Sequence, residues 1–207
     1  MTAIDALTTE PWTQTDQGAW KVREEHRFGP RCGKVNRLVE QLQAETGEGV
    51  PWVDPFCGGV DAPLLIVLKR PGALGAAATR FLSLANTDQT ARNTIAAMQQ
   101  AGLAYGDLLF WNAIPWSGPR DEKFTPAMRQ RGETMLGRLL PLLPRLRAVL
   151  LLGGDAHPLR SAIERWRPEV RVIACAHTSP LAWNQVRHRE GILAAFRAAA
   201  ALAKPGR

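Results

Sequence analysis

The residues best suited to chemistry stand where predicted buried strands end. The apolar run 170–175 leads into His177, and the turn at 179–181 then projects the apolar side chain of Leu181. A second apolar run ends at Asn112, whose amide carries both a hydrogen-bond donor and an acceptor. Together these side chains are suited to binding a polar ring. The structural alternatives are that His177 caps its strand, that Leu181 packs beneath it and that Asn112 is a turn residue.

A third group of side chains follows the apolar run 64–68. Arg70 there precedes a Pro-Gly step, and Asp88 stands at the far end of the same loop. An aspartate in that position most often caps the following helix, here predicted over about 88–102. Phe81 lies between them, and its ring either stacks on a planar ligand or packs the loop.

The order of predicted elements indicates an α/β fold. Apolar runs typical of buried strands cover 64–68, 107–112, 148–152 and 170–175. Helices are expected over 34–46, 88–102, 126–140, 155–166 and 185–203. This alternation predicts a three-layer α/β/α sandwich around a short, mostly parallel four-stranded sheet. Right-handed crossovers place the loops after the strands at one sheet edge, so one cleft should be lined by loops 69–87, 112–124, 153–156 and 176–184.

Length and charge narrow the class of protein. The 207 residues, 45% of them hydrophobic, suffice for one domain over 31–207, with 1–30 as an extension packed on it. The net charge of +7, from 26 Lys and Arg against 19 Asp and Glu, suits a nucleic acid, although a GC-rich genome would also enrich arginine.

The cysteines and the first residues indicate where the protein works. Cys32, Cys57 and Cys175 form neither a disulfide framework nor a Cys-x-x-Cys metal site, and they fit a reduced cytosol. The start of the chain shows neither a secretory signal nor a membrane-spanning run. We therefore expect a cytoplasmic monomer that holds no metal ion or cofactor and binds no membrane.

In order and spacing, these stretches resemble the uracil-DNA glycosylase superfamily over roughly residues 50–190. The segment from His177 to Leu181 matches the second signature, His-x-Ser-Pro-Leu, without interruption, and it is the most specific signal in the chain. Asn112 matches the base-reading asparagine, and Phe81 lies where the family places a stacking aromatic. The resemblance is to a divergent bacterial branch, because three cysteines cannot supply the four thiolates of the iron–sulfur cluster found in some branches.

The resemblance implies a role for each of these residues. His177 would donate a hydrogen bond to O2 of the departing base and stabilise its negative charge while itself neutral. Asn112 would pair with O4 and N3–H of uracil, Phe81 would stack on the flipped base, and Leu181 would fill the gap left in the duplex. The resemblance also implies contacts to DNA by Lys69, Ser179, Pro180, Leu181 and Arg187. When bound to DNA, the protein would lie in the bacterial nucleoid.

The first signature departs from the family pattern at two positions. Well-known branches place Asp or Asn where this chain has Arg70, and a guanidinium cannot position the attacking water as a base. The water is then held by Asn86 or Asp88, or catalysis relies on stabilising the leaving base, and Arg70 contacts phosphate or base. Gly72 stands where strict uracil enzymes place a tyrosine that excludes a 5-methyl group, which implies a wider range of bases.

The sequence therefore predicts a monofunctional DNA glycosylase that hydrolyses the N-glycosidic bond of uracil in DNA and initiates base excision repair. Other deaminated or 5-modified bases are further expected substrates. Two alternatives stay open. The missing carboxylate at Arg70 favours a catalytically silent module that binds damaged DNA, and the loop 153–155 would also suit a hydrolase of nucleosides or nucleotides. His177 and Asn112 favour the enzyme.

Overall fold

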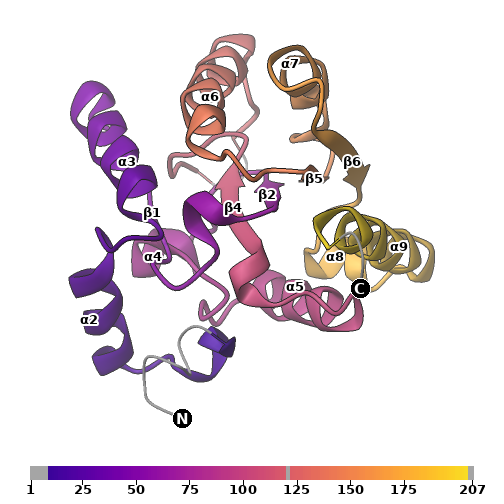
Figure 1. Ribbon diagram of the computed structural model, residues 1–207, viewed down its shortest axis with the longest axis horizontal. Coiled ribbons are helices and arrows are strands. Elements are labelled where there is room, and N and C mark those ends of the chain that lie inside the picture. Colours follow the sequence, from indigo (N-terminus) through magenta and orange to yellow (C-terminus); the bar gives the residue numbers. More distant parts are fainter. Residues whose placement is uncertain (1–8, 120–121, 205–207) are drawn as a thin grey trace.

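The central sheet is parallel throughout. The computed structural model describes residues 9–119 and 122–204, so residues 1–8 of the predicted extension lie outside the described residues. Strands β2 (Leu64–Leu68), β4 (Leu108–Asn112), β5 (Ala148–Leu152) and β6 (Arg171–Cys175) pair in the order β4-β2-β5-β6 (Figure 1). Each begins within one residue of its predicted boundary. The register sets Leu68 opposite Asn112 and Leu152 opposite Cys175, so the strands end at one edge.

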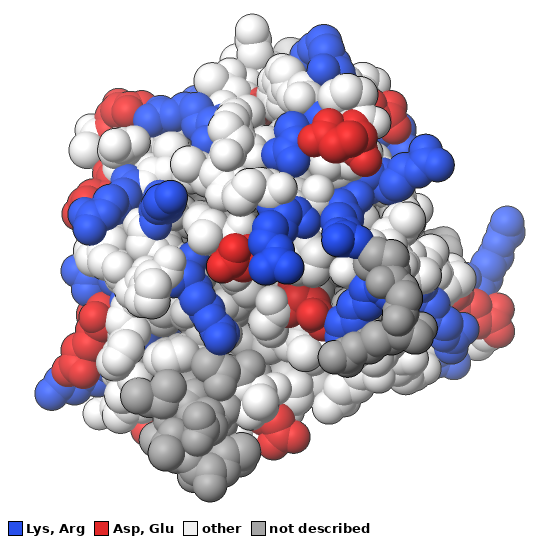
Figure 2. All heavy atoms as spheres, in the orientation of Figure 1, with Lys and Arg blue, Asp and Glu red and all other residues white. Residues whose placement is uncertain are grey.

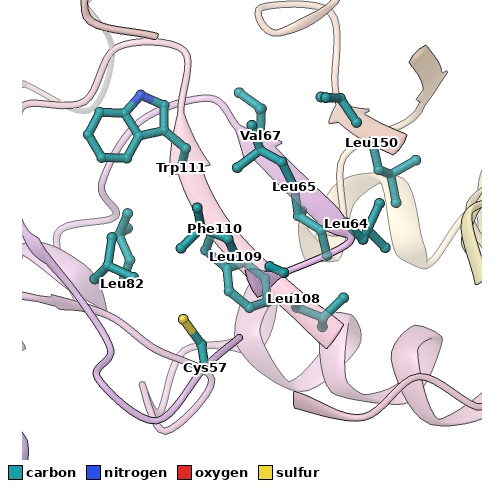
Figure 3. Packing of buried hydrophobic residues seen from close by; sticks show 14 of the residues in the cluster. Cys57, Leu64, Leu65, Val67, Leu82, Leu108, Leu109, Phe110, Trp111 and Leu150 are labelled. Carbon is teal, nitrogen blue, oxygen red and sulfur yellow. The ribbon is translucent and has the colours of Figure 1, made fainter. Parts of the chain in front are cut away.

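Apolar side chains on both faces of the sheet explain why these segments are strands. All residues of β4 and β5 are buried, and β2 is buried up to its last residue. Figure 3 shows this packing around Leu65, Phe110 and Trp111. Strand β6 differs from the prediction because it is an edge strand and only half-buried, although helices contact it from both sides of the sheet.

Helices cover both faces of the sheet, which confirms the three-layer sandwich. Figure 1 shows α6 (Pro126–Leu139) and α7 (Arg160–Trp166) on one side of the strands, and α5 (Gln89–Gln100) and α9 (Val186–Ala203) on the other. Helix α3 (Gly33–Thr46) packs beside α6 and ends at Gly47, whose φ of 68° suits glycine. Among the described residues, no helix is long and apolar enough to cross a bilayer.

Three stretches with no predicted helix or strand contain short regular elements. Strands β1 (Trp52–Val53) and β3 (Phe81–Leu82) pair in parallel as a second small sheet, and α4 (Ala76–Thr79) and α8 (Pro180–Trp183) each form one turn. Two-residue strands carry no periodicity, so tertiary contacts alone define them. The pairing draws Phe81 into the core, where its ring stacks on Trp20 with centroids 6.0 Å apart.

The extension contains a helix, α2 (Gln17–His26), fixed by a buried ion pair. Asp16 caps it by accepting a hydrogen bond from the backbone N–H of Ala19. Arg23 is fully buried and donates from Nε to Asp54 at 3.0 Å. Its other nitrogens donate to the carbonyls of Pro11, Gln14 and Ala19. These acceptors offset the cost of burying the charge and join the extension to the rest of the chain.

Candidate functional site

A cavity of about 380 Å³ opens where the strands of the large sheet end. The loops that follow β2, β5 and β6 contribute to it, and β4 contributes its last residue, Asn112, as parallel topology predicts. The structure brings together most of the residues predicted for the site: Lys69, Arg70, Gly72, Asn86, Asp88, Asn112, His177 and Ser179 all line the cavity. The prediction of one shared cleft is confirmed.

The orientation of His177 is fixed by its own loop. Its Nδ1 accepts a hydrogen bond from the backbone N–H of Ser179 at 3.0 Å, so in the neutral ring the proton is on Nε2. Burial lowers the pKa of His177, the charge of Lys69 lowers it further, and Asp88 and Asp155 oppose both effects. The ring is therefore a neutral donor at physiological pH.

Two neighbours hold this loop in place. Gly153, at φ 89°, lies against His177 so closely that a Cβ would stand 3.0 Å from the histidine Cβ. Thr178 is buried, its carbonyl accepts from Asn93 at 2.8 Å, and its hydroxyl shares a hydrogen bond with Thr94 at 2.9 Å. Both partners are on α5, so that helix positions His177.

Asn112 carries a donor that the protein does not use. The side chain is 1% exposed, and its Nδ2 has no hydrogen-bond partner among the described residues. An unpaired buried donor costs about 1–3 kcal/mol, and such groups are rare enough to need an explanation. A ligand with an acceptor that approaches Asn112 in the cavity would remove this cost.

Asp88 and Asn86, the two candidates for holding water, differ in what they leave free. The Oδ1 of Asp88 caps α5 by accepting from the backbone N–H groups of Thr90 and Ala91. Its Oδ2 accepts no hydrogen bond within the described chain. Both ends of the Asn86 amide are engaged, because Oδ1 accepts from Thr79 at 2.7 Å and Nδ2 donates to the carbonyl of Phe81 at 3.0 Å. Asn86 holds the loop, and Asp88 offers a free oxygen.

Arg70 is held by the loop that follows Asn112. Its side chain is 7% exposed, and its Nη1 donates to Glu122 at 2.8 Å and to the carbonyl of Pro119 at 3.1 Å. The guanidinium also lies over the ring of Phe124, 5.2 Å from its centroid. Glu122 therefore compensates the charge of Arg70, while the buried Nε and Nη2 have no hydrogen-bond partner among the described residues.

Lys69 and Arg129 form a second cationic group beside the cavity. Both pair with Asp155 at 3.2 Å, and both side chains are 40% exposed. Across the face seen in Figure 2, Lys and Arg side chains alternate with Asp and Glu and do not merge into one patch. The positive net charge therefore does not by itself identify which surface would bind a nucleic acid.

The other predicted residues lie outside the cavity. Phe81 is 2% exposed and does not line it, because β3 places the ring in the core against Trp20. Phe110 is the aromatic that lines the cavity. Pro180 begins α8, Leu181 is 79% exposed, and Arg187 is exposed on α9, and none of these three lines the cavity.

Ser83 is a lining residue that sequence reasoning missed. Its hydroxyl donates to Oδ2 of Asp54, the oxygen that also accepts from Arg23, and it accepts from the backbone N–H of Ala85. Asp54 therefore links Arg23 of the N-terminal segment to Ser83 in the cavity wall. A serine among apolar neighbours gives no signal of this in the sequence.

No metal site is evident in the described parts of the chain, where no group of three or more His, Cys, Asp or Glu side chains is arranged to hold an ion. The cavity instead offers hydrogen-bond donors, one free carboxylate oxygen and apolar walls.

No family model matches the sequence, and no curated protein matches it. Among solved structures, Pedobacter heparinus SMUG2 is similar at a TM-score of 0.48 and 14% identity, covering 83% of this chain and 86% of that chain. A mimivirus UNG variant in complex with UGI is similar at a TM-score of 0.40 and 14% identity, covering 89% of this chain and 75% of that chain.

Proposed function

We propose that the chain is a DNA glycosylase that hydrolyses the N-glycosidic bond of uracil in DNA. The observation that carries the proposal is the hydrogen bond from Ser179 to Nδ1 of His177, which leaves a neutral Nε2–H donor in a cavity shared with the unpaired amide of Asn112. A base leaving deoxyribose takes up negative charge on its carbonyl oxygens, and fixed donors of this kind stabilise such charge as it develops.

In the proposed reaction, a uracil flipped from the duplex enters the cavity. Asn112 donates to O4, and Nε2–H of His177 donates to O2. The bond between C1′ and N1 breaks, and the base keeps the electron pair as an anion. Water then adds to C1′, its oxygen forming the new bond, and its proton passes to Oδ2 of Asp88 and on to solvent.

Two lining residues support the finer details of the proposal. The Lys69 side chain forms an ion pair with Asp155 at 3.2 Å, so its nitrogen is engaged rather than free to attack the sugar, which supports a monofunctional reaction. Gly72 has open space where a side chain would begin, so no wall faces a substituent from that position. Other deaminated or 5-modified bases are therefore proposed as slower substrates, and repair of damaged DNA by a cytoplasmic monomer is the proposed setting.

The silent binding module is the weaker alternative, because Asp88 keeps a carboxylate oxygen free in the cavity although Arg70 has replaced the family's usual residue. One experiment distinguishes the DNA glycosylase from the second alternative, a hydrolase of nucleosides or nucleotides. The purified protein is incubated with a uracil-containing oligonucleotide, with free deoxyuridine and with deoxyuridine monophosphate, and abasic sites are then cut with alkali.

The expected result is cleavage at the uracil position and no release of uracil from the small substrates. His177→Ala should lower single-turnover excision by about 100-fold or more, the effect of losing one oriented donor, and leave DNA affinity almost unchanged. Binding to uracil-containing DNA without excision would identify a silent module. Hydrolysis of the small substrates alone would identify the other hydrolase.

A further inference from the structure

Two leucines stand out on the surface beside the cavity. In the described parts of the chain, the most exposed large apolar side chains are Leu74, at 82%, and Leu181, at 79%. Leu74 lies between Gly72 and Ala76, which line the cavity, and Leu181 lies two residues after Ser179, which also lines it. Single exposed apolar residues are ordinary, but two at one opening indicate a surface that binds a partner.

Leu74 sits on a turn that is held rigidly. The carbonyl of Gly72 accepts hydrogen bonds from the backbone N–H groups of Gly75 and Ala77, both at 3.1 Å, and α4 follows directly. Gly75 packs against Asp88 so closely that a Cβ there would collide with Oδ2. The turn is thus fixed to the N-terminus of α5, and it leaves Leu74 exposed to solvent.

Leu181 is carried by α8, and the loop before it is anchored on the same helix, α5. One turn of helix carries it, closed by hydrogen bonds from the backbone N–H groups of Trp183 to Ser179 and of Asn184 to Pro180. The loop before this turn is anchored on α5 through Thr178. Both leucines are therefore carried by segments anchored on the first turns of α5, one at its N-cap residue Asp88 and the other at Asn93 and Thr94.

The charges beside the opening indicate what these side chains meet. Lys69 is half-exposed and lies five residues before Leu74, and Arg129 shares its partner Asp155. Apolar tips between cations suit a nucleic acid duplex, whose phosphates pair with the cations while its stacked bases accept an apolar wedge. A lipid surface or an apolar protein groove would not require the cavity between the tips.

We propose that Leu74 is a second wedge, which enters the base stack on the side of the flipped nucleotide opposite Leu181. The inference rests on the proposed function, because a wedge matters only where a base must leave a duplex. Two wedges on segments anchored to one helix would hold the gap open from both sides. Leu74 would then act on double-stranded DNA and leave excision from single strands unchanged.

The test compares single-turnover uracil excision from duplex and from single-stranded oligonucleotides. Leu74→Ala and Leu74→Gln should lose at least about tenfold on the duplex, the scale of one leucine side chain withdrawn from burial, and less than about twofold on the single strand. Leu74→Met keeps an apolar side chain of similar length and is the matched control, which should retain duplex excision. Equal losses on both substrates, or no loss on the duplex, would overturn the second wedge.

A second measurement separates the wedge from the proposed chemistry. Fluorescence of 2-aminopurine placed beside the uracil reports unstacking whether or not the base is excised. Wild-type protein should raise this fluorescence, and Leu74→Ala should raise it less at saturating protein. If the wild type excises nothing from either substrate, the proposed function fails, and the fluorescence still decides the wedge: equal signals from the two proteins would overturn it.

Discussion

The Nδ1 atom of His177 and the backbone N–H of Ser179 are joined by a hydrogen bond of 3.0 Å. This bond exists only while Nδ1 is unprotonated, and burial keeps it so by lowering the pKa of His177 below its usual 6.5. Excision should therefore stay constant from pH 8 down to about 6.5 and decline only at lower pH, when the ring takes up a second proton. A rate that increases as the pH falls through about 6.5 would show that the protonated ring is the active form.

The same depressed pKa fixes the sign of a stability effect. Below about pH 6.5 the unfolded chain binds a proton at this histidine before the folded chain does. The neutral His177 ring therefore contributes fully to the free energy of unfolding above about pH 6.5. This contribution is lost as the pH falls toward the pKa that His177 has in the folded protein. Urea unfolding of the wild type and His177→Gln at pH 7.5 and 5.5 measures it, and the wild type should lose more stability between the two values.

The two oxygens of Asp88 predict a separation of stability from activity. Asp88→Ser keeps an N-cap oxygen for α5 but removes the oxygen that faces the cavity. We expect it to lower excision by about 100-fold or more, as losing a group that positions the nucleophile should, with little change in melting temperature. Asp88→Ala should lose activity and also about 1 kcal/mol of stability, because the cap is lost as well.

Asn86 and Arg70 provide the matched controls for Asp88. Because both ends of the Asn86 amide bind the loop, Asn86→Ala should lower the melting temperature more than Asp88→Ser does. Arg70→Asp introduces an acidic residue found at this position in the first signature of well-known uracil-DNA glycosylases, and it should give no gain in rate if Asp88 already holds the water. Robust excision by Asp88→Ser would exclude Asp88, and a gain by Arg70→Asp would indicate that the wild-type site lacks a water ligand.

Gly72 predicts the range of bases. Nothing lies within 4 Å of the position where its side chain would begin, so a larger residue fits without moving the backbone. Gly72→Tyr should lower excision of 5-substituted pyrimidines relative to uracil by about 10-fold or more, since contacts with one methyl group are worth about 1–3 kcal/mol. The ratio of single-turnover rates on the two bases is the measurement, and an unchanged ratio would show that position 72 does not face the ring.

The buried pair of Arg23 and Asp54 predicts a large stability effect far from the cavity. Arg23→Met leaves the Asp54 carboxylate buried without its cation and should cost about 3–5 kcal/mol. Arg138→Met removes a cation from an exposed pair with Glu45 and is the control, which should leave the melting temperature almost unchanged. Similar melting temperatures for the two variants would contradict the role assigned to Arg23.

The large sheet was predictable because its strands are short apolar runs bounded by breaks in the pattern. The same topology predicted that Asn112 and His177 would line one cleft, because they stand at the carboxyl ends of parallel strands. Phe81 shows where that reasoning stops. Its distance along the chain from the Pro-Gly step suggested a lining role, but pairing with Trp52 in β1 turned the ring into the core. Such pairing depends on contacts that no local pattern encodes.

The N-terminal segment was the least predictable part of the molecule. Arg23 looks like any surface arginine in sequence, and its burial depends on Asp54, thirty-one residues away. Ser83 was missed for a related reason, because its place at the cavity follows from Asp54. Side chains whose position is set by another buried side chain give no periodic signal in the sequence.

The carboxylate of Asp54 accepts from Arg23 of α2 and from Ser83 of the cavity wall at one oxygen. Unfolding α2 would leave the Asp54 carboxylate buried without its cation. We therefore expect α2 and the cavity wall around Ser83 to unfold together. The backbone amides of α2 and those near Ser83 should then exchange hydrogen for deuterium with one common free energy, as a single cooperative unit. Deleting the N-terminal segment would therefore also make the wall of the cavity less rigid.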